Sequence, residues 1–148
     1  MIKTVLHVES LQNPISILEE LFKSSGLSLI QAAFRHSFFL DPEKVREHTP
    51  RFPDFARQSG THYPGKKKGD YAKWKGKKVR LDDNTRGQMA WKWYSGRKIE
   101  RSSGYGVRHI WGNPWNPDAY TAGWNLCYMP FWVGMLTEDQ HPHPDLQK

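Results

Sequence analysis

Two Asn-Pro pairs, at residues 113–114 and 116–117, divide the C-terminal half of the chain into short segments. Proline has no amide donor, and the residue before it avoids the helical region, so no long helix can run through this stretch. Before the pairs, Gly104–Trp111 alternates in the manner of a strand, and Gly123–Tyr128 predicts a second short strand after them. Pro130 can then begin a helix. The sequence predicts a ββα unit here.

The first part of the chain is helical in pattern. Asn13 and Pro14 can begin a helix and Gly26 can end it. The apolar stripe of this helix, which we expect to pack in the core, is Ile15, Leu18, Leu21 and Phe22. A second periodic run covers residues 29–34, and Asp41-Pro42 can open a short helix through Val45. From His48 to Gly65, repeated proline and glycine predict an ordered loop or a linker.

These patterns together predict an α+β fold. A helical N-terminal region (residues 1–64) precedes a basic segment and the ββα unit (residues 65–148), in one compact domain. The single cysteine, Cys127, excludes a disulfide framework and a four-cysteine zinc site. No stretch supplies the roughly 20 apolar residues of a membrane span, and the first residues lack the apolar centre of a signal peptide. We expect a soluble, cytoplasmic protein with no membrane partner.

Residues 65–80 contain seven lysines, one arginine and one aspartate, a local net charge of +7 that equals the net charge of the whole chain. Lysine side chains neutralise phosphates and release counterions, and aromatic rings between them can stack on bases. The alternative is a solvated surface loop. The candidate nucleic-acid-binding residues are Lys66, Lys67, Lys68, Lys73, Trp74, Lys75, Lys77, Lys78 and Arg80.

The next segment predicts a helix that ends at Gly96 and is capped by Asp82 or Asp83. Its apolar face is expected to be Met89, Ala90, Trp93 and Tyr94, with Arg86 and Lys92 outside. This face predicts packing into the core.

Most of the seven histidines have no metal-ligand spacing, and the pair His141 and His143 supplies only two ligands. His109 differs because it lies near the end of a predicted strand, where a neutral imidazole suits general-base chemistry on a water. Asn125, in the second strand, can tie the connecting loop to the backbone through its amide. The alternatives are a hydrogen-bonded structural histidine and a turn asparagine.

The segment GYGVRHIWGNPWNPDAYTAGWNLCYMP resembles the core of the HNH (ββα-metal) nuclease superfamily, in particular its zinc-free restriction-type variants. The resemblance covers residues 79–140. It implies that His109 is the general base, that Asn125 is the central asparagine, and that a divalent metal (Mg, Mn or Zn) takes part in cleaving DNA.

The chain departs from that pattern at two ligand positions. The residue before the base, often an acidic or histidine ligand in the family, is Arg108, which we expect to bind a flanking phosphate. The position of the final histidine, about nine residues after the asparagine, is Gly134. Residues 138–143 could substitute, which gives His109, Asp139 and His141 as the candidate metal ligands.

The sequence thus favours an HNH-like endonuclease that hydrolyses phosphodiester bonds of DNA with a divalent metal. A non-catalytic nucleic-acid-binding module is the first alternative, favoured by the missing histidine. A protein-interaction module with an aromatic surface is the second.

Overall fold

The structure is a computed structural model that describes residues 14–46, 49–100, 102–137 and 143. It confirms the α+β class, with two compact units at residues 1–35 and 36–148. The first unit contains the helices α1 (Pro14–Ser24) and α2 (Leu29–Arg35). The second contains, in chain order, β1 (Phe38–Phe39), α3 (Pro42–Arg46), β2 (Phe55–Arg57), β3 (Tyr71–Trp74), β4 (Lys77–Asp82), α4 (Thr85–Ser95), β5 (Tyr105–His109), α5 (Pro117–Tyr120), the 3₁₀ turn η2 (Gly123–Asn125), β6 (Leu126–Pro130) and α6 (Phe131–Thr137).

The end of α1 is fixed at Gly26, as the sequence predicts. Gly26 has a left-handed φ of 73°, and the amides of Gly26 and Leu27 donate to the carbonyls of Lys23 and Phe22. This pair of bonds satisfies the last carbonyls of the helix in a Schellman motif. The expected core stripe is only partly correct, because Leu21 is 61% exposed. Asn13, the expected cap, lies outside the described residues.

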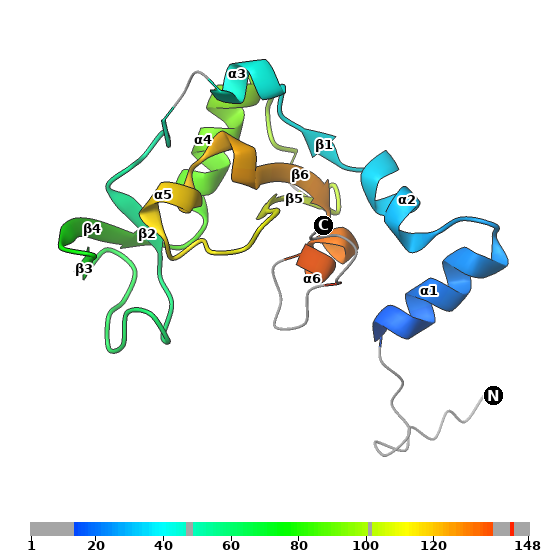
Figure 1. The fold of residues 1–148 in the computed structure, drawn as a ribbon, viewed down its shortest axis with the longest axis horizontal. Helices are drawn as coiled ribbons and strands as arrows, with labels where there is room; N and C mark the ends of the chain where they lie inside the picture. Colours follow the sequence, from blue (N-terminus) through cyan, green and yellow to red (C-terminus); the bar gives the residue numbers. More distant parts are fainter. Residues whose placement is uncertain (1–13, 47–48, 101, 138–142, 144–148) are drawn as a thin grey trace, which may run out of the picture. The chain divides into compact units, whose positions relative to one another are not determined.

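In the second unit, β1, β6 and β5 form an antiparallel sheet with β6 in the centre (Figure 1). Its two faces carry different helices. Val107, Leu126 and Tyr128 pack with the α4 residues Ala90 and Trp91 in the main core. Gly106 and Arg108, which alternate with Val107 along β5, lie against α6. The order β5, β6, α6 reproduces the predicted strand–strand–helix order.

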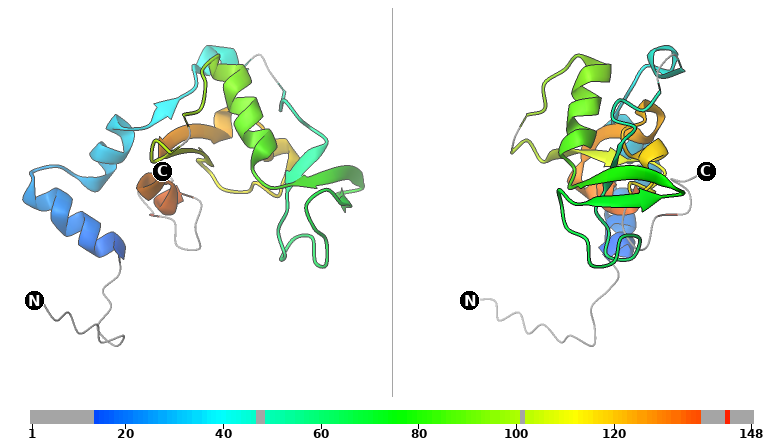
Figure 2. Two further views of the ribbon diagram at one scale, coloured as in Figure 1. Left: turned by 180° about the vertical axis from the view of Figure 1, so that it is seen from behind. Right: turned by 90° about the vertical axis from the view of Figure 1, so that its left-hand side faces the viewer.

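A second sheet has the order β2-β4-β3, with β2 parallel and β3 antiparallel to β4 (Figure 2). Strands β3 and β4 are joined by the two residues Lys75 and Gly76, which have φ of 47° and 84°. Two consecutive positive φ values are the mark of a tight hairpin turn whose twist matches that of the strands. The inner face of this sheet forms a small core of Ala56, Tyr63, Val79 and Leu81.

The connection between β5 and β6 ties the two sheets together. The amide of Arg57 in β2 donates to the Pro114 carbonyl at 2.8 Å, and the Tyr63 hydroxyl donates to the Trp115 carbonyl at 2.6 Å. The Tyr120 hydroxyl reaches the carboxylate of Asp82 at the end of β4. The long loop predicted from the Asn-Pro pairs is therefore an ordered bridge.

Helix α4 ends at Gly96 as predicted, and its expected buried face is half correct, because Ala90 and Tyr94 are buried whereas Met89 and Trp93 are not. Trp91 is 2% exposed and Trp93 is 46% exposed, with Met89 also exposed. Both faces of this helix carry large apolar side chains, so periodicity alone could not select between them. The outer face is covered by cations, since the Arg51 guanidinium lies 4.7 Å from the Trp93 ring.

Two short strands fall where the sequence predicted loop or helix. Both precede residue 65, and they pair with β6 and β4. Residues 36–64 therefore belong with the C-terminal part of the chain rather than with a separate helical region. No helix in the described part of the chain is long and apolar enough to cross a membrane.

Candidate nucleic-acid interface

The outer face of the β2-β4-β3 sheet gathers cations and aromatic rings. Val79 and Leu81 of β4 point into the core, so Lys78 and Arg80, which alternate with them, point outward. Across the hairpin, Lys73 pairs with Lys78 and Tyr71 pairs with Arg80. Paired positions share a face of the sheet, and all four side chains are exposed.

Two further residues extend this surface. Phe55 of β2 pairs with Arg80 on its other side, and the Arg86 guanidinium from α4 lies 4.8 Å from the Phe55 ring. A hollow of about 260 Å³ opens among Phe55, Arg80 and Arg86. We call this surface the basic face; its members are Phe55, Tyr71, Lys73, Lys78, Arg80 and Arg86.

The rings of the basic face lie close to its cations. The Lys78 ammonium is 4.1 Å from the centre of the Tyr71 ring, and Tyr71 is 54% exposed. An exposed ring among cations can stack on a base while the cations meet the neighbouring phosphates. Phe55 and Tyr71 were not among the candidates from sequence, although the alternation of residues 77–82 could have identified the outward positions.

The remaining candidate lysines are exposed but differ in their contacts. Lys77 donates to the Pro53 carbonyl at 2.8 Å and lies 3.5 Å from the Asp54 carboxylate. Lys66, Lys67 and Lys68 lie in the loop before β3, and Lys75 lies in the hairpin turn. The structure therefore brings Lys73, Lys78 and Arg80 together on one face, and of the other candidate lysines Lys68 lines the hollow beside it.

Trp74, the aromatic candidate from sequence, points the other way. It is half-buried against the small core on the inner face of the sheet, and its ring lies 6.2 Å from that of Tyr63. Within the hairpin, Tyr71 and not Trp74 therefore offers a ring to solvent.

Lys68 and Asp83 form an ion pair beside this face. Their Nζ and Oδ2 atoms are 2.5 Å apart. The hydrogen bond from Lys68, with others from Thr85, holds the pKa of Asp83 well below its usual range. The same bond raises the pKa of Lys68. Asp82 and Asp83 also accept the first-turn amides of Arg86 and Thr85, so both predicted capping residues serve α4, although Asn84 is the N-cap residue.

His109 ends β5 as predicted, but it is completely buried. Its Nε2 lies 2.9 Å from the Tyr120 carbonyl oxygen, and its ring stacks on the Tyr120 ring at 5.7 Å. Its surroundings are those of a hydrogen-bonded structural histidine. The general-base role stays a prediction. A general base must reach a water, and the side chain of His109 has no exposed surface in the described structure.

Asn125 holds the connecting loop as predicted. Its Oδ1 accepts the Trp111 amide at 2.8 Å, and its Nδ2 donates to the carbonyls of Gly112 and Ala119 at 2.9 and 3.2 Å. The side chain is fully buried. It thus satisfies three backbone groups that a buried loop would otherwise leave without partners.

Arg108 and Gly134, which stand where the HNH resemblance implies metal ligands, lie in contact with each other. A Cβ built on Gly134 would come within 2.8 Å of Nε of Arg108. Arg108 therefore lies across Gly134, with its guanidinium 5.7 Å from the Phe131 ring. A guanidinium carries only donors and a positive charge, so it cannot coordinate a divalent cation.

The remaining predicted ligands, Asp139 and His141, lie outside the described residues. Within the described residues, no group of three or more His, Cys, Asp or Glu side chains could hold a metal ion. Those residues do not fit the metal that the resemblance implies.

No family model matches this chain, and neither the curated proteins nor the solved structures include one significantly similar to it.

Proposed function

We propose that this protein binds nucleic acid through the basic face and without a metal, and that the nucleic acid is DNA. The observation that carries the proposal is the placement of Lys73, Lys78 and Arg80 on one exposed face with the Tyr71 ring. Three cations within two paired strands meet several consecutive phosphates at once. This arrangement supplies sequence-independent affinity through counterion release.

Two features near β5 lead us to favour binding over the endonuclease hypothesis, which stays untested. Arg108 and Gly134 occupy the implied ligand positions, and His109 is sealed from solvent. A cation in the place of a metal ligand still suits phosphate, since arginine binds phosphate with paired donors. Contacts among the described residues therefore support binding, whereas hydrolysis stays an untested prediction whose ligands Asp139 and His141 lie outside them.

The test is a titration of duplex DNA at several salt concentrations. Replacing Lys73, Lys78 and Arg80 by Gln should weaken binding and reduce the slope of log K against log salt by about three. The matched control replaces Lys23, Arg46 and Lys92, which are exposed and remove the same charge. Equal losses in both triple variants would reduce the proposal to a net-charge effect and overturn the basic face as the site.

A cleavage assay separates binding from hydrolysis. Wild-type protein with plasmid DNA is tested with Mg, Mn and Zn in turn, and no nicking is expected. Nicking that disappears in His109→Ala, while Tyr120→Phe of comparable stability still cuts, would restore the endonuclease hypothesis.

A further inference from the structure

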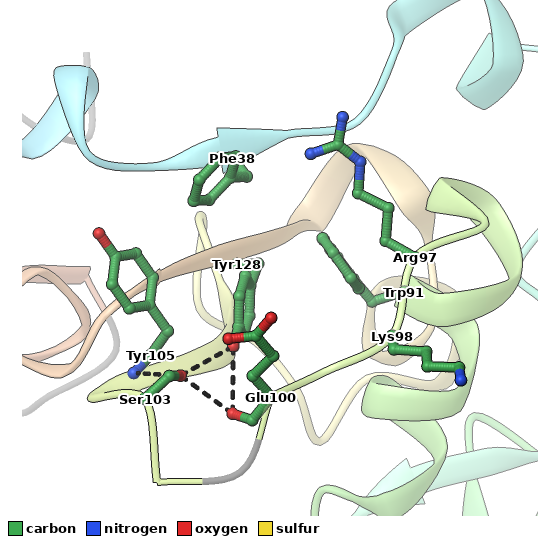
Figure 3. A pocket seen from close by; sticks show the side chains of 8 residues that line it. All are labelled: Phe38, Trp91, Arg97, Lys98, Glu100, Ser103, Tyr105 and Tyr128. Carbon is green, nitrogen blue, oxygen red and sulfur yellow. Dashed lines mark hydrogen bonds between the residues drawn. The ribbon is translucent and has the colours of Figure 1, made fainter.

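A pocket of about 450 Å³ opens on the face of the β1-β6-β5 sheet that α4 covers (Figure 3). Four aromatic rings from four elements line it: Phe38 of β1, Trp91 of α4, Tyr105 of β5 and Tyr128 of β6. Neighbouring rings are close, with centroids 5.0 Å apart for Trp91 and Tyr128 and 5.4 Å for Tyr105 and Tyr128. The volume lies within the range of about 300–1,000 Å³ usual for small-ligand pockets.

The other four residues that line this aromatic pocket are polar, namely Arg97, Lys98, Glu100 and Ser103. Ser103 Oγ bonds the Tyr128 hydroxyl at 3.1 Å and the Glu100 carbonyl at 2.9 Å, which leaves the Glu100 carboxylate as the acidic group of the wall (Figure 3). The Trp91 indole N–H is buried and has no acceptor among the described residues.

Arg97 marks where an anion would lie. It lines the aromatic pocket and also a second hollow of about 340 Å³, as do Phe38 and Trp91. Lys44 also lines the second hollow, so its two cations, Arg97 and Lys44, outnumber its one carboxylate, that of Asp41. The aromatic pocket thus opens beside cations, so a ligand with a planar ring and an adjoining negative charge matches both parts.

We propose that the aromatic pocket binds a nucleoside phosphate, namely an unpaired base of the nucleic acid bound at the basic face. The base stacks among the rings, its phosphate lies at Arg97, and its amino group donates to the Glu100 carboxylate. The proposal rests on the proposed function, which supplies the strand. Because thymine has no exocyclic amino group, an unpaired adenine binds better than an unpaired thymine.

The experiment compares duplexes of one length and sequence, fully paired or with a single unpaired 2-aminopurine, adenine or thymine. The unpaired purines should bind at least about fivefold more tightly than the paired duplex, the lower end of what one base–aromatic stack contributes. The fluorescence of 2-aminopurine should fall on binding. Phe38→Ala and Arg97→Gln should abolish the preference, and Glu100→Ala should remove the difference between adenine and thymine. Trp111→Ala and Lys92→Gln change exposed residues outside the pocket. They should keep the preference for an unpaired base and the difference between adenine and thymine.

The outcomes separate the two proposals. Equal affinity for paired and unpaired duplexes, with the normal salt slope, overturns the pocket and leaves the basic face. If no duplex binds, the basic face is wrong, and a titration with free dAMP tests the pocket alone. A shift of the Trp91 indole N–H resonance with dAMP, lost in Arg97→Gln, then supports a free nucleotide as the ligand. No shift overturns the pocket as well.

Discussion

The Tyr120 hydroxyl donates a 2.7 Å hydrogen bond to the Asp82 carboxylate, and it also lies 3.1 Å from the Asp83 carbonyl. Tyr120 belongs to the connection between β5 and β6, while Asp82 ends β4 and accepts the Arg86 amide in the first turn of α4. Both side chains are buried, so this contact joins the two sheets below the protein surface. Burial, followed by the hydrogen bond to Asp82, raises the pKa of Tyr120 far above its usual value.

Tyr120→Phe should therefore destabilise the protein by about 1–3 kcal/mol, because it leaves a buried carboxylate short of a donor. The matched control is Tyr71→Phe, which removes an exposed hydroxyl and should change stability by less than about 0.5 kcal/mol. Urea denaturation followed by circular dichroism measures both. Equal effects would contradict a role for this bond in joining the sheets.

The two tryptophans of α4 should differ strongly in their contribution to stability. Trp91 is packed against Tyr128 in the main core, whereas Trp93 is nearly half exposed beneath Arg51. Trp91→Ala should cost about 3–5 kcal/mol, and Trp93→Ala less than about 1 kcal/mol. Chemical denaturation of the two variants decides the point, and the reverse order would favour the helix face expected from sequence.

Asn125→Ala should destabilise the protein by at least about 2 kcal/mol, since it leaves three backbone groups of the connecting loop without partners. The control is Asn113→Gly, because Asn113 is exposed and its φ of 55° suits glycine. Hydrogen exchange adds a local measurement, in which the Trp111 amide should lose its protection in Asn125→Ala. Retained protection would mean that the loop is held by its other contacts.

Much of this fold can be predicted from short sequence patterns. The positions of Gly26 and Gly96 and of the Asn-Pro pairs depend on chain conformation within a few residues, which sequence encodes directly. The missed strands, β1 and β2, have only two and three residues. They exist because distant strands supply their hydrogen bonds, and no short pattern in the sequence records that pairing.

The candidate site shows the same division. The charge of residues 65–80 was visible in the sequence, but which of its cations share a face depends on the register of the hairpin. The contact of Arg108 with Gly134 joins residues on two elements, and the aromatic pocket joins residues on four. Such sites are defined by packing, which periodicity alone does not determine.

The ion pair of Asp83 and Lys68 should make the stability of the protein sensitive to acid. The pKa of Asp83 is lower in the folded protein than its ordinary value, so its stabilising effect is present above the ordinary pKa, near 4, and is lost as the pH falls below it. Wild type should lose stability between about pH 5 and pH 3 more steeply than Asp83→Asn. Denaturation midpoints across this range measure the difference, and parallel curves would contradict it.

The same pair should limit the affinity for DNA. Lys68 lines the hollow of the basic face, and its ammonium is held by the Asp83 carboxylate. Asp83→Asn removes a negative charge from beside the phosphates and frees Lys68 to bind one. Affinity should rise, and the salt dependence should steepen by about one released counterion. Asp118→Asn makes the same change of charge at an exposed residue of α5 that is not a member of the basic face, and it should leave the slope unchanged. Titrations of duplex DNA at several salt concentrations distinguish the two variants. An unchanged slope in Asp83→Asn would place the bound phosphates beyond the reach of Lys68 and restrict the interface to Lys73, Lys78 and Arg80.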